Sequence, residues 1–354
     1  MTRQHKDSQS RAEMTVTAVS HEGATSRLRI DAAATTLRIA SALREQVTLQ
    51  LKRRGLIIAM SGGVDSSVCA GLAVRALGPS RVFGLMLPER DSDPESLQLA
   101  VTWAEQLGIN FAVEDISPAL EGLGCYRRRN DAIRTVVPEF GPDWKCKIVL
   151  PGQRLDSDRL NVFQLAVQRP EGGAVSYVRL TAEAYRQIVA ATNFKQRTRK
   201  MIEYYHADRL HYAVIGTPNR LEYDQGFFVK GGDGLADVKP IAHLYKTQVY
   251  QLAAYLGVPP RITDRPPTTD TYSLPQTQEE FYFSLPATTM DLVLQAHNED
   301  LTVEDAAEQL GFTIEQVRRG YREIAQKRAT TRYLHLPAQL VEHVLDVTTP
   351  LETR

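Results

Sequence analysis

Apolar positions between residues 28 and 116 change their spacing several times, and each change marks a predicted element. From Leu28 to Arg54 they recur at helical spacing, and Gly55 ends the run. Continuous apolar stretches then predict strands, with helical periodicity between them. The strands are expected at 56–60, 81–87 and 109–116, and the helices at 66–77 and 94–108. This alternation predicts an α/β fold with a doubly wound parallel sheet, which binds ligands at the carboxyl ends of its strands.

The pattern continues after a segment of different texture. Residues 141–181 contain short strand-like runs around a Pro/Gly turn, which we interpret as an inserted β-hairpin. These runs are residues 147–152, 161–170 and 174–181. A helical pattern then covers residues 182–210, a strand pattern 211–217 and a further helical pattern 246–257. We therefore expect one α/β domain over residues 29–285.

Both ends of the chain differ from this domain. Residues 1–28 are polar and weakly periodic, which predicts a mobile N-terminal extension. Residues 286–354 are expected to form a helical C-terminal region. Within it, residues 302–328 resemble a helix-turn-helix. An ordinary pair of helices with solvated charges is the favoured interpretation, because the whole chain has no basic surplus that would support DNA binding.

Charge and cysteine content narrow the function classes. The 42 basic residues balance 42 acidic ones, so the net charge favours neither nucleic acid nor an anionic membrane as a partner. No apolar run reaches the ~20 residues that a bilayer requires, and no secretory signal is recognisable, so we expect a cytoplasmic protein. Cys69, Cys125 and Cys146 form no metal-ligand spacing and are expected to be buried reduced thiols.

The stretch "AMSGGVDSSV" contains the most informative chemistry. It joins a predicted strand to a predicted helix, where unpaired N–H groups at the positive end of the helix dipole favour phosphate. Gly62 and Gly63 allow close approach of the backbone, and Ser61 and Ser66 add hydroxyl donors. Asp65 would repel a phosphate unless a cation lay between them, so its presence indicates Mg2+ as well as an anion.

The loop departs from the better-known phosphate motifs, because no lysine follows the second glycine and the glycines are adjacent. It resembles the pyrophosphate loop of the N-type ATP pyrophosphatases, which have the adenine nucleotide alpha hydrolase-like fold. Residues 214–270 are similar to the catalytic half of the NAD+ synthetase family, and "NFKQRTR" at 193–199 resembles its Asn/Arg-bearing helix. The resemblance covers roughly residues 30–135 and 190–285.

The resemblance implies an ATP and Mg2+ site. The residues that would hold the β and γ phosphates are Ser61, Gly62, Gly63, Asp65 and Ser66. Asp65 and Glu222 would be the metal ligands, which suits a hard cation that prefers oxygen donors. Lys246 would contact ATP phosphates and oppose the charge on departing pyrophosphate. Further ATP contacts are implied for Thr217 and Thr268 near the α phosphate, and for Arg90 and Arg197 on the adenine-ribose or the acid substrate.

The resemblance also implies the second substrate. Asn193, Lys230, Asp233 and Asp237 fall among positions that bind a carboxylate-bearing dinucleotide, and Asp233 would also deprotonate or orient ammonium. The implied catalytic residues are Asp65, Lys246 and Asp233. The implied reaction adenylates nicotinate adenine dinucleotide with release of pyrophosphate, and ammonia then displaces AMP to give NAD+. Family members bind this acid across a homodimer interface.

Some residues depart from the family pattern. Gly231 stands where an aromatic residue usually follows the lysine, and Gln326 where the family often has histidine. Amidation of a different carboxylic acid is therefore an alternative. Sulfur transfer through Cys125 or Cys146 is another, and a nucleotide-binding regulator a third. The pyrophosphatase unit begins within the first sixty residues, so we expect free ammonium or a separate glutaminase as the nitrogen source.

Overall fold

A parallel sheet forms the centre of the molecule. The computed structural model describes residues 26–150, 163–266, 271–276, 282, 287–342 and 344. The strand order is β3 (Asn110–Val113), β2 (Val82–Met86), β1 (Leu56–Ala59), β7 (Ala213–Val214), and every pairing is parallel. Each predicted strand of the βαβαβ unit is present, so the predicted α/β sheet is confirmed.

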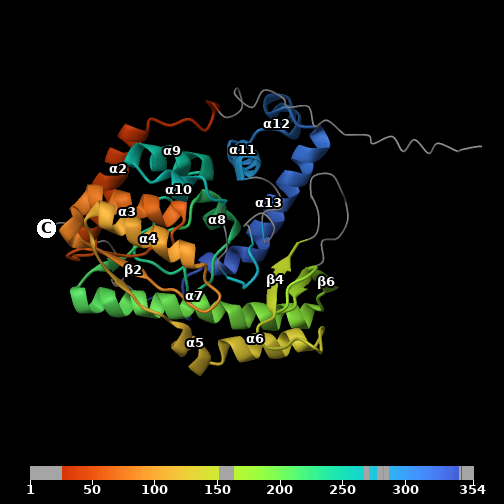
Figure 1. The fold of residues 1–354 in the computed structure, drawn as a ribbon. Coiled ribbons are helices and arrows are strands. Elements are labelled where there is room, and N and C mark those ends of the chain that lie inside the picture. Colours follow the sequence, from red (N-terminus) through yellow and green to blue (C-terminus); the bar gives the residue numbers. More distant parts are fainter. Residues whose placement is uncertain are drawn as a thin grey trace, which may run out of the picture.

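Helices cover both faces of this sheet, because alternate strand residues point to opposite sides. On one face lie α2 (Ala32–Glu45), α3 (Val64–Leu77), α4 (Pro94–Leu107) and α9 (Lys246–Leu256), with the π-helical turn η1 (Gln46–Gln50) extending α2. The 3-10 turn η2 (Pro79–Arg81) leads into β2. On the other face lie α5 (Ser117–Gly122), α6 (Cys125–Arg134) and the long helix α7 (Ala182–Leu210), which runs beneath the sheet in Figure 1.

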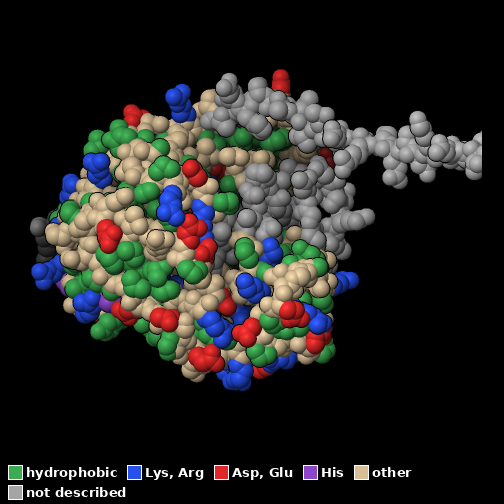
Figure 2. Space-filling view, viewed as in Figure 1, with side chains coloured by type: hydrophobic (Ala, Val, Ile, Leu, Met, Phe, Trp, Pro, Cys, Tyr) green, Lys and Arg blue, Asp and Glu red, His purple; other side chains and the backbone are tan. Residues whose placement is uncertain are grey.

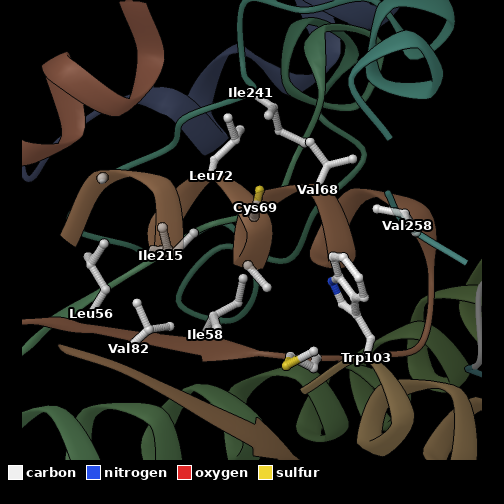
Figure 3. Close-up of a cluster of buried hydrophobic side chains, with 14 of the residues drawn as sticks. Leu56, Ile58, Val68, Cys69, Leu72, Val82, Trp103, Ile215, Ile241 and Val258 are labelled. Atoms are coloured by element: carbon white, nitrogen blue, oxygen red, sulfur yellow. The ribbon is translucent and has the colours of Figure 1, made fainter. Parts of the chain in front are cut away.

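The two faces have separate apolar clusters. Figure 3 shows Val68, Cys69 and Leu72 of α3 packed among Leu56 and Ile58 of β1 and their neighbours. On the opposite face, Ile57 and Leu85 pack with residues of α6 and α7. All three cysteines are buried with free thiols, as predicted.

The insertion is a small antiparallel sheet. The three predicted runs form β4 (Lys145–Val149), β5 (Gln164–Gln168) and β6 (Ser176–Arg179) in that order, so a third strand accompanies the expected hairpin. Residues 271–276 lie against β4: Cys146 N donates to Ser273 Oγ at 2.9 Å, and Leu274 N donates to Cys146 O at 3.2 Å. The insertion therefore supports a later segment of the chain.

The C-terminal region is helical, as predicted. The remaining helices are α8 (Arg220–Gln225), α10 (Pro260–Thr263), α11 (Ala287–Asn298), α12 (Val303–Leu310) and α13 (Ile314–His335). α11, α12 and α13 share an apolar cluster with Leu28, which is fully buried. The predicted boundary of the mobile extension at residue 28 is therefore wrong, because the buried Leu28 belongs to the folded part of the chain. Residues 1–25 lie outside the described residues.

The charges on the C-terminal helices take part in ion pairs. Arg318 and Arg319 both pair with Glu315, and Arg328 pairs with Asp224 of α8. On the face shown in Figure 2, basic and acidic side chains are interspersed over the described surface. This arrangement supports the ordinary helical pair over a DNA-binding one. Within the described ranges, no helix is long and apolar enough to cross a membrane.

Candidate active site

The glycine loop follows β1 at the carboxyl edge of the sheet and leads into α3. Gly62 has φ +78°, and a Cβ there would lie 2.2 Å from the carbonyl oxygen of Ser96. A side chain at this position would have to displace the backbone of α4. Gly63 is the N-cap residue of α3 and provides no side-chain cap, so N–H groups of the first turn face the loop. The hydroxyls of Ser61 and Ser66 lie 3.1 Å apart beside them.

Asp65 in the first turn of α3 is held by two other elements. Its carboxylate forms an ion pair with Lys246 at the start of α9, and Asn219 Nδ2 donates to its Oδ1 at 3.1 Å. Burial alone would lower the pKa of Lys246, but the carboxylates of Asp65 and Glu222 outweigh it and raise that pKa. The lysine is therefore a fixed positive charge beside the loop.

Asn219 and Glu222 are coupled through a capping box at the start of α8. Asn219 Oδ1 accepts from Glu222 N at 3.1 Å, and Glu222 Oε2 accepts from Asn219 N at 3.2 Å. Asn219 was not among the predicted site residues, although an asparagine three positions before a glutamate is a recognisable capping signal.

The donor set fits Mg2+ without forming a complete cage. Asp65 and Glu222 supply oxygen donors from two elements, and both carboxylates raise the pKa of the same lysine, Lys246. Among the described residues, no group of three or more His, Cys, Asp or Glu side chains is placed to hold a metal. Mg2+ usually keeps waters and shares phosphate oxygens, so two carboxylates beside a phosphate loop suit it.

One cavity of about 470 Å3 brings most of the predicted site together. The predicted residues that line it are Ser61, Gly62, Gly63, Asp65, Ser66, Asn193, Arg197, Thr217, Glu222, Lys230, Asp233 and Lys246. They come from the glycine loop, α7, α8, α9 and the loops after β7. The phosphate side and the acid side of the predicted site therefore share one space.

Three predicted residues are not part of this lining. The guanidinium of Arg90 lies 3.6 Å from the centre of the Tyr126 ring, and Asp237 Oδ2 accepts from Val214 N at 2.7 Å. The structure does not bring either residue to the cavity, because each is engaged by a neighbouring element. Thr268 lies outside the described residues.

The acid side contains a lysine engaged by the C-terminal helix. Lys230 Nζ donates to the carbonyl oxygens of Tyr333 and Leu336 at 2.7 and 2.9 Å, at the end of α13. Tyr333 itself lines the cavity. The carbonyl end of a helix favours a cation, so α13 fixes the position of Lys230.

Asp233 lies on the same side. Its Oδ1 accepts from Val229 N at 2.8 Å. Burial raises the pKa of Asp233 above its ordinary value of 3.8, although the hydrogen bond and the nearby cations Lys200 and Arg199 oppose that shift.

A buried ion network next to the cavity was not predicted. Lys195 Nζ of α7 donates to Glu89 Oε1 at 2.8 Å, to Asp91 Oδ2 at 2.7 Å and to the carbonyl oxygen of Thr271 at 2.7 Å. Arg129 also pairs with Asp91, at 2.5 Å. The network joins the loop after β2 to residues 271–276, and both contribute to the cavity lining.

Fold and site together define a class. The chain has a doubly wound α/β sheet with a glycine loop, two carboxylates and a lysine at its carboxyl edge, which is the arrangement of a nucleotide-binding enzyme. A sequence profile of the NAD synthase family matches residues 36–134 and 170–333. The chain therefore belongs to the NAD synthase family, a family of ligases.

Individual relatives agree with this assignment. The chain is 57% identical over 317 residues to the NH(3)-dependent NAD(+) synthetase of Rhizobium rhizogenes, covering 90% of this chain and 95% of the relative. It is 38% identical to the enzyme of that name from Thermotoga maritima, covering 71% and 84%.

Solved structures support the fold. The NH3-dependent NAD synthetase from Campylobacter jejuni, in complex with the nitrate ion, has a TM-score of 0.58 at 18% identity and covers 88% of this chain and 100% of that one. The NMN synthetase from Francisella tularensis has a TM-score of 0.57 at 22% identity, covering 88% and 99%.

Proposed function

We propose that this chain converts nicotinate adenine dinucleotide to NAD+, using ATP and ammonia. The observation that carries the proposal is the shared cavity, which is lined both by the glycine loop, Glu222 and Lys246 and by Asn193, Lys230 and Asp233. A reaction that joins an ATP phosphate to a bound carboxylate requires both sets of groups in one space. The relatives' names support the same activity.

The first step adenylates the acid. A carboxylate oxygen of the substrate attacks the α phosphorus of ATP, and the bond from that phosphorus to the bridging oxygen breaks to release pyrophosphate. The N–H groups at the start of α3 and the ammonium of Lys246 stabilise the negative charge that builds on the leaving pyrophosphate. Asp65 and Glu222 would hold Mg2+, which neutralises and orients the phosphates when bound.

The second step forms the amide. Ammonium transfers a proton to the Asp233 carboxylate, and the resulting ammonia attacks the acyl carbon of the adenylate. The new C–N bond forms, the acyl C–O bond breaks, and AMP leaves with the bonding electrons. The nitrogen loses its second proton to water. Asn193 and Lys230 would bind the dinucleotide on this side of the cavity.

The proposal is tested by product analysis. Purified protein with ATP, Mg2+, ammonium and nicotinate adenine dinucleotide is expected to give NAD+, AMP and pyrophosphate in equal amounts. Asp65→Ala is expected to lower pyrophosphate release by at least about 100-fold, because it removes a Mg2+ ligand and leaves Lys246 without its ion-pair partner. Pyrophosphate release that requires a different acid would refute the proposed substrate, and unchanged turnover in Asp65→Ala would refute the metal assignment.

Assembly and location are part of the same proposal. A second copy of this chain is the proposed partner, and the exposed Met201 and Tyr205 of α7 are candidate contact residues for it. Light scattering of the purified protein is expected to give the mass of a dimer. Free ammonium or a separate glutaminase supplies the nitrogen, and the cytoplasmic location stays a prediction.

A further inference from the structure

Helix α7 contains a buried ion pair that faces the cavity. Lys200 Nζ donates to Glu203 Oε2 at 2.7 Å, and the two side chains are 5% and 4% exposed. Both residues line the same cavity as Asp233. The proposed function gives neither of them a role.

A buried ion pair of this kind adds little to the stability of the fold. Removing two charges from water costs several kcal/mol, and an apolar pair of similar volume is often as stable or more so. α7 also buries apolar residues such as Ile188 and Ala207, and one further charged side chain, Lys195, whose ionic partners lie on another element. Stability therefore does not explain a charged pair in the cavity wall. The electric field that the pair creates in the cavity explains it directly.

The loop that carries Asp233 packs on the same part of α7. A Cβ at Gly232 would lie 2.9 Å from Cβ of Gln196, so loop and helix are in close contact one residue before Asp233. Lys200 is one helical turn after Gln196 and lies on the same face of α7. Arg197 Nε also donates to the carbonyl oxygen of Lys230 at 3.3 Å.

The charges around Asp233 come from α7 and from the segment after its own loop. Lys200 and Arg199 stabilise the Asp233 carboxylate against burial. The carboxylate of Glu203 acts in the opposite direction to these cations, because it and Asp233 repel each other. Burial and Asp233 raise the pKa of Glu203, and Lys200 lowers it. Lys239 is the remaining charged residue near Asp233. Burial and Lys200 lower the pKa of Lys239, and Asp233 raises it.

We propose that Lys200 and Glu203 are a positioning pair that sets the charge state of Asp233 where this carboxylate meets ammonium. Lys200 favours the ionised carboxylate that accepts the proton, and Glu203 holds the Lys200 ammonium in place and limits its effect. The inference rests on the proposed function, because it assigns these residues to the amide-forming step.

The pair makes opposite predictions for its two members. Lys200→Met removes the cation and leaves Glu203 beside Asp233, so the acid limb of kcat/KM for ammonia is expected to move up by about one pH unit. Glu203→Gln leaves the Lys200 charge unopposed, so the limb is expected to move down. The acid limb of the double variant Lys200→Met/Glu203→Leu is expected to lie between those of the two single variants. The acid limb of Lys200→Arg is expected to lie near that of the unaltered protein. ATP and nicotinate adenine dinucleotide are kept saturating, and the ionisation of ammonium in solution is common to all profiles.

Two controls separate this role from a structural one. Arg318→Met breaks the Arg318–Glu315 pair, which has the same i,i+3 spacing but is exposed on α13, and is expected to leave the profile unchanged. Urea unfolding of each variant reports the loss of stability, and the double variant retains a volume-matched apolar pair if a single variant fails to fold.

The outcomes distinguish the inference from the proposed function. Acid limbs that coincide in all variants, or move in the same direction for Lys200→Met and Glu203→Gln, would overturn the inference. Asp233→Asn tests the underlying step, and is expected to keep pyrophosphate release but lose most NAD+ formation. If Asp233→Asn forms NAD+ at the normal rate, the role of Asp233 fails. If Asp233→Asn is inactive and the pair variants do not shift, only the positioning role fails.

Discussion

Replacing Lys195 with methionine removes a cation that three acceptors share in the interior. The Lys195 side chain is 1% exposed and that of Glu89 is fully buried, so water cannot replace the lost contacts. Breaking a buried ion pair costs about 3–5 kcal/mol, mostly because the remaining charge is left uncompensated. Glu89 keeps the Tyr126 hydroxyl at 2.7 Å, and Asp91 keeps Arg129. We therefore expect Lys195→Met to lower the free energy of unfolding by about 3 kcal/mol, at the lower end of that range.

Urea denaturation at pH 7.5 measures this change. The matched control is Arg261→Met, which breaks a pair with Glu95 whose side chains are 68% and 50% exposed. Exposed pairs contribute about 0–1 kcal/mol, so the control is expected to unfold near the midpoint of the unaltered protein. A loss for Lys195→Met no larger than that of the control would refute the reasoning.

Acid provides a second measurement on the same network. Burial alone would raise the pKa of Asp91, but Lys195 and Arg129 lower it below the ordinary value of 3.8. Asp91 therefore contributes stability that is present above pH 3.8 and is lost as the pH falls through the lower pKa of the folded state. In Lys195→Met the pKa of Asp91 rises, so acid unfolding is expected to begin at a higher pH. An unchanged acid midpoint would contradict the assignment.

Two further predictions concern the loop and α11. Gly62→Ala is expected to raise KM for ATP and to slow pyrophosphate release at least about 10-fold, because the new Cβ would meet the Ser96 carbonyl oxygen and φ is +78°. The control is Gly78→Ala, where φ is +80° but a Cβ would meet open space. Equal activities of the two variants would contradict the prediction. Burial raises the pKa of Asp291 to about 6, so the contribution of this one group to stability is greatest below pH 3.8 and falls by up to about 3 kcal/mol as the pH rises to 6 and above. Asp291→Asn is expected to remove this part of the pH dependence when unfolding is measured at pH 4.5 and 7.5, and an unaltered dependence would contradict it.

The sheet and the glycine loop were predictable because their signals are local. Apolar runs of strand length, separated by helical periodicity, identified β1, β2 and β3, and the loop after β1 carried its own chemistry in Gly62 and Asp65. Lys246 lies 181 residues from Asp65, and only the family resemblance connected them. The ion pair between them supports that connection.

The charged residues of α7 were missed for a physical reason. Lys195, Lys200 and Glu203 stand in a charge-rich helical sequence, which normally indicates a solvated face. Their burial depends on partners from the loop after β2 and on the loop around Asp233, so no local pattern reveals it. Arg90 is the reverse case: it follows a strand, but Tyr126 of α6 engages it away from the cavity.

The inserted sheet contributes to the site through residues 271–276. The family profile does not match residues 135–169, which contain β4 and β5, yet Cys146 of β4 bonds to both Ser273 and Leu274. Lys195 of α7 donates to the carbonyl oxygen of Thr271, the first residue of this short segment, and to Glu89 and Asp91 of the loop after β2. Thr271 and Tyr272 both line the cavity. Because β4 and Lys195 both hold this segment, and two of its residues line the cavity, we infer that the insertion supports this wall of the cavity and belongs to the architecture of the site.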